Sequence, residues 1–130
     1  MTGLTPLAKE LIDGRNIAFL ATVMQDGSPQ VTPVWIDRED DTILINTAEG
    51  RVKHRNILRD PRVAIAITDS RNPYRMVAIK GKVTEVTTEG AEEHIDKLAK
   101  KYLNLEKYPW KAGETRIIIK IKPEKITEMT

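Results

Sequence analysis

Apolar and polar residues alternate along much of the chain with the two-residue period of half-buried β-strands. The first such segment, 16–24, places Ala18 and Leu20 on one face and Ile17 and Phe19 on the other. The same period predicts further strands over 30–37, 42–46, 62–68, 74–86 and 116–121. The pattern therefore predicts six strands.

Turn residues separate these strands and indicate how they pair. Asp26-Gly27 is a strong hairpin signal between the first two strands, and the acidic segment 37–41 is predicted to form a second hairpin loop. Strands joined by short turns run antiparallel, so we expect one antiparallel sheet. Gly81 interrupts the longest strand and indicates a bend or bulge, which suits closure of the sheet into a small barrel.

Three segments have the features of helices. The longest predicted helix covers 89–103, has an apolar stripe at helical spacing, and follows Thr88 as its N-cap. Shorter helices are predicted over 6–13, with Thr5 as N-cap, and over 51–59. The expected fold class is mainly β (α+β): a six-stranded antiparallel barrel with one longer and two short helices.

The composition is that of an ordinary globular protein, and 1–130 is expected to form one domain. The chain is 40% apolar and 31% charged, and no apolar run approaches the roughly 20 residues that span a bilayer. Its first residues lack the basic-then-apolar order of a signal peptide, so we expect a cytoplasmic protein. The lack of cysteine excludes disulfides, thiolate metal sites and a cysteine nucleophile.

Cationic residues gather in the segment 51–62, although the net charge of the chain is only +2. A hydrophobic strand leads into this segment and a short helix begins there. A helix N-terminus offers free N–H groups and a positive dipole end, so Arg51 and Lys53 in the first turn predict a phosphate site. The alternative is an ordinary solvated helix start. No aromatic platform accompanies the cluster, so we predict neither a nucleic-acid nor a membrane partner.

Residue types that catalyse reactions or bind metals are sparse. His54 and His94 are the only histidines, and neither has a ligating neighbour at coordinating spacing. Ser28 and Ser70 lack a Ser–His–acid arrangement, and no glycine-rich phosphate loop or dinucleotide fingerprint is present. We therefore predict no catalytic side chain and no metal site.

Several segments, taken in order, resemble a known family. They are 18–22, 27–35, 45–47, 50–57 with 60–62, and 77–83. Together they resemble the flavin-binding split β-barrel proteins related to pyridoxamine 5′-phosphate oxidase. More closely, the chain is similar to the small oxidoreductases that bind the deazaflavin coenzyme F-420. The resemblance covers nearly the whole chain and implies a homodimer with two cofactor sites at the subunit interface.

The resemblance also implies which residues bind the cofactor. In such proteins the second hairpin strand lines the ring, the end of the third strand contacts it, and a lysine after the turn holds the phosphate. The implied cofactor-binding residues are Gln30, Thr32, Pro33, Val34, Ile45, Asn46, Thr47, Arg51, Val52, Lys53, Arg55 and Met76. The implied cofactor is coenzyme F-420 or FMN. Hydride chemistry then belongs to the cofactor, which explains the lack of an acid–base pair.

Two residues depart from the pyridoxamine 5′-phosphate oxidase pattern. Val52 stands where that family has an arginine, and Met76 stands where it has a glutamine. Both changes weaken the case for FMN, and the chain lacks the C-terminal extension for pyridoxal-type substrates, so we do not expect vitamin B6 synthesis. Arg51, Arg55 and Arg59 suit the longer polyanionic tail of F-420. The resulting hypothesis is an oxidoreductase acting on an unidentified small-molecule substrate.

Three alternatives stay open on the sequence. The first is FMN as the cofactor, and the second is a non-catalytic carrier or scavenger of flavin or heme. The third is a purely structural dimer or a nucleic-acid module. Trp35 is interpreted as core or dimer interface, and Trp110, in the loop 104–113, as packing or substrate stacking.

Overall fold

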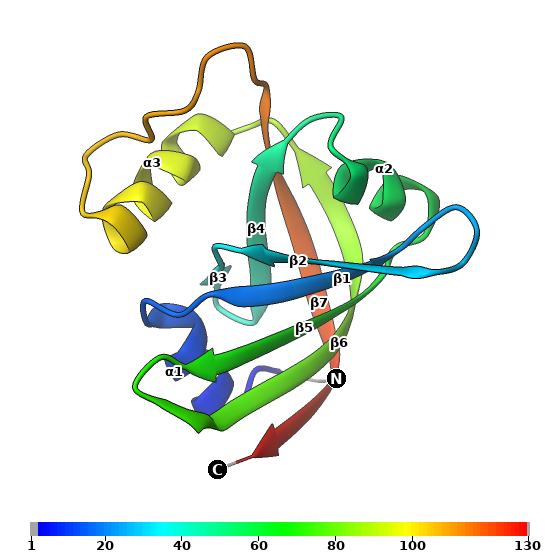
Figure 1. Cartoon of the computed structure of the whole chain (residues 1–130), viewed down its shortest axis with the longest axis vertical. Helices are drawn as coiled ribbons and strands as arrows, with labels where there is room; N and C mark the ends of the chain where they lie inside the picture. Colours follow the sequence, from blue (N-terminus) through cyan, green and yellow to red (C-terminus); the bar gives the residue numbers. More distant parts are fainter. Residues whose placement is uncertain (1–2, 130) are drawn as a thin grey trace.

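A computed structural model describes residues 3–129 and contains a seven-stranded antiparallel sheet with strand order β2-β1-β5-β6-β7-β4-β3 (Figure 1). The strands are β1 (Ala18–Val23), β2 (Pro29–Val34), β3 (Asp37–Glu39), β4 (Thr42–Ala48), β5 (Arg62–Asp69), β6 (Asn72–Thr87) and β7 (Arg116–Met129). The helices are α1 (Pro6–Asp13), α2 (Val52–Arg59) and α3 (Ala91–Leu103). Within 3–129, no helix is long and apolar enough to cross a membrane. The predicted mainly β class with three helices is confirmed.

The predicted six-stranded closed barrel is wrong. The sheet has seven strands and is open, because β2 and β3 are its two edges and are not paired with each other. The extra strand is β3, which falls in the segment 37–41 predicted as a loop and pairs with β4 from Asp37↔Leu44 to Glu39↔Thr42. Only the turn at Asp40 remains, with φ 54°. Charged residues on a short edge strand discourage further pairing. Here the same charged residues made the segment resemble a loop, so the strand was not predicted.

The bend expected at Gly81 is confirmed. The β6–β7 register shifts between Lys80 and Gly81 and again between Val83 and Glu85. A Cβ at Gly81 would lie 2.8 Å from both Ile121 Cγ2 and the Lys122 carbonyl oxygen, so only glycine fits this close approach. The bend turns the β2-β1-β5 half of the sheet across the β7-β4 half (Figure 1).

Of the two N-caps predicted from the sequence, the one of α1 is confirmed and the one of α3 is wrong. Thr5 caps α1 as predicted, because its hydroxyl accepts from the Ala8 N–H at 3.1 Å. Thr88 does not cap α3: the N-cap is Gly90, in the left-handed region at φ 74°, with no side-chain cap. The carbonyl of Thr88 instead accepts from the Ala91 N–H at 3.2 Å, which starts the helix two residues later than predicted.

Strand β4 and the first half of β7, residues 116–121, are buried on both faces. Ile43 and Ile45 point into the main core, whereas Leu44 belongs to a second cluster with Ala91 of α3 and Ile118 of β7. This two-sided cover accounts for the continuous burial of β4 from residue 43 to 48. Because β3 pairs only with residues 42–44, β4 from Ile45 onward has a strand neighbour only in β7. A cavity lies beside this free edge.

Candidate functional site

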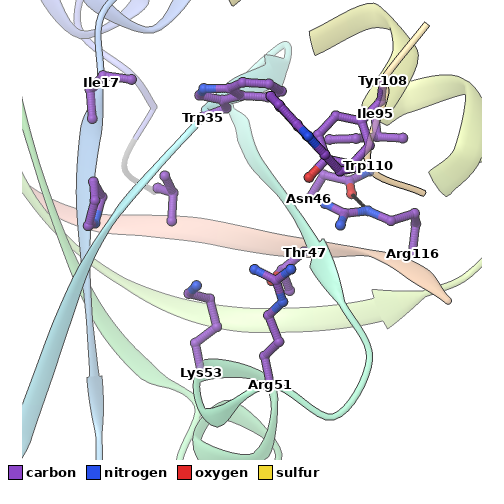
Figure 2. A pocket seen from close by; sticks show the side chains of 12 residues that line it. Ile17, Trp35, Asn46, Thr47, Arg51, Lys53, Ile95, Tyr108, Trp110 and Arg116 are labelled. Atoms are coloured by element: carbon purple, nitrogen blue, oxygen red, sulfur yellow. Dashed lines mark hydrogen bonds between the residues drawn. The ribbon is translucent and has the colours of Figure 1, made fainter. Parts of the chain in front are cut away.

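The cavity has a volume of about 370 Å³ and lies between the end of β2 and the part of β4 that β3 does not cover (Figure 2). Its walls come from segments far apart in sequence. They are Ile17, Pro33, Val34, Trp35, Asn46, Thr47, Arg51, Lys53, Ile95, Tyr108, Trp110 and Arg116. A volume of this size falls in the range of small-molecule sites, which are about 300–1,000 Å³.

Three cations from two elements converge on one side of the cavity. Arg51 and Arg116 share a single carboxylate, since Arg51 Nη2 lies 2.6 Å from Glu114 Oε2 and Arg116 Nη1 lies 3.0 Å from Glu114 Oε1. Lys53 has no ion pair within residues 3–129. Burial, and then the nearby Arg51 and Arg116, lower the pKa of Lys53. The local charge is therefore positive, and an anion would relieve it.

The start of α2 adds to this positive potential. Arg51 is the N-cap in extended conformation, no side chain caps the helix, and the first turn holds no acidic residue. The first N–H groups of a helix have no intrahelical partner, and here no acidic residue of the first turn offsets the positive dipole end. Lys53 and Arg51 project from this turn into the cavity (Figure 2). The arrangement suits a phosphate group.

Aromatic rings form the opposite wall. Trp35 stacks on Tyr102 with centroids 5.2 Å apart and planes 7° apart, and the Tyr108 ring meets Trp35 edge-on at 5.9 Å. Trp110 packs edge-on against Tyr108 at 5.5 Å and is 61% exposed. The guanidinium of Arg116 lies 5.0 Å from the Tyr108 centroid. One cavity therefore combines a cationic side with an aromatic side, which suits a planar ligand carrying an anionic tail.

Six of the twelve predicted cofactor residues line this cavity. They are Pro33 and Val34 of β2, Asn46 and Thr47 of β4, and Arg51 and Lys53 at the start of α2. The strand–turn–helix segment and the second hairpin strand thus meet in one place, as the resemblance implies.

Three other predicted residues belong to the same strand or helix as lining residues but do not line the cavity. Gln30 accepts a hydrogen bond at Oε1 from the Thr22 hydroxyl at 3.2 Å. The Thr32 hydroxyl is buried and has no hydrogen-bond partner within the described chain. Thr32 lies two residues before Val34 and therefore shares its face of β2. Val52 is half-buried as the first residue of α2.

The remaining three predicted residues point elsewhere in this chain. The Ile45 side chain is fully buried in the main core. Arg55 is exposed on α2. Met76 lies at the far end of β6, where it pairs with Met129.

Several lining residues were not predicted from the sequence. Trp35 and Trp110 were interpreted mainly as packing, and both line the cavity. Tyr108 and Arg116 were not singled out. Arg116 is the clearest omission, because it is only 5% exposed although it stands at the start of a strand. An arginine directly before an isoleucine-rich strand was a usable signal, since a charged residue beside a fully buried segment needs a partner.

Comparison with known proteins identifies the relatives of this chain. Residues 4–130 match the family described as pyridoxamine 5′-phosphate oxidase. The chain belongs to this family. The pyridoxamine 5′-phosphate oxidase family resemblance stated from the sequence is therefore confirmed.

Several solved structures are similar to this chain. An F-420 reductase is 30% identical, with 92% of this chain and 94% of that chain covered and a TM-score of 0.81. Group A Streptococcus HupZ is 26% identical, with 96% and 93% covered and a TM-score of 0.71. A conserved hypothetical protein from Mycobacterium tuberculosis is 22% identical, with 93% and 81% covered and a TM-score of 0.72, which shows the shared fold.

Within residues 3–129, no group of three or more histidine, cysteine or acidic side chains could hold a metal ion. The polar groups of the cavity walls are one amide, two hydroxyls, two indole N–H groups and three cations, and the lining residues include no carboxylate or histidine. The side chains of this cavity are suited to bind and orient an anionic, planar molecule.

Proposed function

We propose that the protein is an oxidoreductase that transfers a hydride between a bound flavin-type cofactor and a small-molecule substrate. The cofactor of this proposal is coenzyme F-420, with FMN as the alternative. The observation that carries it is Lys53, a half-buried cation without an anionic partner within residues 3–129, in a cavity that it shares with Arg51, Arg116 and a wall of aromatic rings.

The residues present fit such a cofactor. Lys53, Arg51 and the first N–H groups of α2 would hold the phosphate. Pro33, Val34 and Thr47 would lie along the ring. The buried Thr32 hydroxyl, which lacks a partner within the described chain, would gain one from a bound polar ring edge.

When bound, the cofactor supplies the hydride chemistry. The protein's part is to bind, orient and exclude water. The cations neutralise the tail, the strand β2 orients the ring edge, and Trp35 with Tyr108 covers one side of the cavity. The lining contains no acid–base pair, which agrees with a division of labour in which the protein does not itself transfer a proton.

The preference for F-420 rests on two supports. The F-420 reductase named above is 30% identical over nearly the full length of both chains. The cation set is also larger than one phosphate needs, because Arg51, Lys53 and Arg116 all reach one cavity. A longer polyanionic tail would use these charges more fully.

Fluorescence titration with F-420 and with FMN tests the proposal. Lys53→Ala should weaken binding of the preferred cofactor at least about tenfold, as expected for a lost charged hydrogen bond of about 1.5–3 kcal/mol. Lys122→Ala is the matched control, because Lys122 is an exposed lysine of β7 outside the cavity. Equal affinities of the two variants would overturn the assignment. Tight binding without hydride transfer to enone or quinone acceptors would instead favour the carrier function.

The proposal includes a homodimer, as the family resemblance implies. The outer face of β1, β2 and β5 is apolar: Phe19 is 48% and Val31 is 62% exposed, beside the small Ala21 and Ala64. Exposed apolar patches of this kind are typical of protein interfaces. Light scattering should give a dimer for the wild type and a monomer for Phe19→Asp. Leu58→Asp, which changes a 65% exposed leucine on α2, is the control expected to stay dimeric.

A further inference from the structure

A chain of buried polar side chains runs from the outer surface beside α3 into the cavity. Its members are Asp37 of β3, His94 of α3, Asn46 of β4 and Arg116 of β7, which are 8%, 8%, 9% and 5% exposed. Four buried polar residues in an isoleucine-rich region are costly unless each is paired. The last two line the cavity, whereas the first two do not.

The hydrogen bonds of this chain have a fixed direction. Arg116 Nε can only donate, so the atom of Asn46 that lies 2.9 Å from it is the carbonyl oxygen Oδ1. Asn46 Nδ2 then donates to the Ala91 carbonyl oxygen at 2.9 Å and meets His94 Nδ1 at 3.1 Å. His94 Nδ1 must therefore accept. In the neutral ring the proton is then on Nε2, which donates to Asp37 Oδ2 at 3.0 Å.

Asp37 anchors the outer end. Burial acts to raise the pKa of Asp37, but hydrogen bonds from His94, the Arg38 N–H and Lys97 outweigh it and hold the pKa well below its usual range. The carboxylate is therefore ionised and keeps the Nε2 proton of His94 turned outward. Lys97 Nζ lies 3.0 Å from the same oxygen and its side chain is 69% exposed.

At the inner end the chain restrains the guanidinium of Arg116. Nε is held by Asn46 and Nη1 by Glu114, while Nη2 makes no hydrogen bond within the described residues. Glu114 in turn holds Arg51 at 2.6 Å. Two of the three cavity cations are thereby linked to His94.

We propose that His94 and Asp37 are positioning residues that orient Arg116, through Asn46, for binding of the anionic cofactor. This inference rests on the proposed function. It names two residues outside the cavity as determinants of affinity, and it makes that affinity depend on a neutral His94. A proton on Nδ1 would face the Asn46 amide N–H, the amide would turn, and its N–H would then oppose Arg116 Nε. Protonation of His94 is therefore expected to weaken ligand binding.

Several other charged groups lie near His94. Asp37 faces Nε2 from β3 and Lys97 accompanies it from α3, while Arg116 acts from β7 through Asn46. The shallow depression beside His94 also holds Arg38 and Glu39 of β3, Glu89 before α3, Glu93 of α3 and Lys120 of β7. His54, the other histidine, accepts from the Gly50 N–H at 2.9 Å next to α2.

The experiment uses the full-length protein and two readouts. The first is the NMR signal of the Arg116 Nε–H, which needs no ligand. It should be sharp and slow to exchange in the wild type and in Asp37→Asn, which keeps an acceptor for His94, and lost in Asp37→Ala and His94→Ala. The second is the affinity for F-420 and FMN between about pH 8 and about pH 5.5, where imidazole titrates. The wild type should lose about tenfold or more, and His94→Gln should lose much less. His54→Gln separates the contribution of His54.

An unchanged Arg116 signal in Asp37→Ala and His94→Ala, or identical pH profiles for the wild type and His94→Gln, would overturn the inference. If the alanine variants do not fold, the Arg116 Nε–H signal and the pH profile of ligand affinity are compared between Asp37→Asn and His94→Gln, and this comparison decides the inference. If the wild type binds neither cofactor, the proposed function fails, and the Arg116 signal alone decides whether His94 positions this side chain.

Discussion

The two faces of β4 and of the first half of β7 are similarly buried but differ in composition. Toward the main core lie Ile43, Ile45 and Ile119, each 0% exposed. Beneath α3, the same strands place Asn46 and Arg116 at 9% and 5% exposure. An aliphatic face tolerates any packing of the right volume, whereas a polar face functions only when each donor meets an acceptor. We therefore assign most of the stability to the aliphatic face and the contribution of Asn46 and Arg116 to ligand binding to the polar face.

The largest expected effect is on the aliphatic face. Ile45→Ala should lower the free energy of unfolding by about 2–5 kcal/mol, because it removes buried methyl groups and leaves a cavity. Denaturant unfolding measures this loss. Ile45→Val is the graded control, with an expected cost of about 0.5–1.5 kcal/mol. A loss below about 1 kcal/mol for Ile45→Ala would show that this face does not carry the stability.

The next largest effect is expected from Arg116, on the polar face beneath α3. Arg116→Lys keeps the charge but loses the planar fork that joins Asn46 to Glu114. We expect cofactor affinity to fall about tenfold, which corresponds to about 1.4 kcal/mol, with a smaller change in stability. Titration and thermal unfolding of the same samples separate the two. A variant that loses stability but keeps its affinity would reverse the proposed assignment of the faces.

Acid unfolding tests the contribution of Asp37, at the outer end of the buried polar chain. The pKa of Asp37 is lowered on folding, so its carboxylate stabilises the native state above the unfolded pKa of about 3.9, and the contribution is lost as pH falls toward the lower folded value. Between about pH 5 and about pH 3 the free energy of unfolding should decrease more steeply for the wild type than for Asp37→Asn. Parallel curves would mean that the network does not stabilise the Asp37 carboxylate.

The smallest effect concerns Lys97, at the surface end of the polar chain. Lys97→Ala should change the free energy of unfolding by about 0.5 kcal/mol or less, because exposed ion pairs are screened by solvent. Cofactor affinity should stay the same, since His94 still donates to Asp37. A marked loss of affinity, measured by the same titration, would show that the charge of Lys97 and not the His94 bond orders the site.

Much of the fold follows from local rules that the sequence carries. The Thr5 cap and the Asp26-Gly27 hairpin depend on neighbouring residues only, and both occur as expected. The short strand β3 was not predicted, because it is buried by tertiary contacts with residues distant in sequence. Asp37 is 8% exposed on account of His94 and Lys97, which lie nearly sixty residues away in sequence.

The cavity-lining residues were predictable only where several of them lie in one continuous segment of the sequence. The strand–turn–helix segment brought Asn46, Thr47 and Lys53 to the cavity, as expected. Arg116 and Tyr108 reach it from the end of the chain, through the bend of the sheet and the packing of α3. No local pattern encodes such a meeting, because it depends on how distant elements are placed and not on their own propensities.

The chain has two tryptophans, and both Trp35 and Trp110 line the cavity. Practically all indole emission of the chain therefore originates beside the candidate site. Occupancy can be followed by quenching or energy transfer in unlabelled protein, and the stacked Trp35 and the exposed Trp110 offer two environments whose spectra distinguish entry at the rim from arrival at the ring wall.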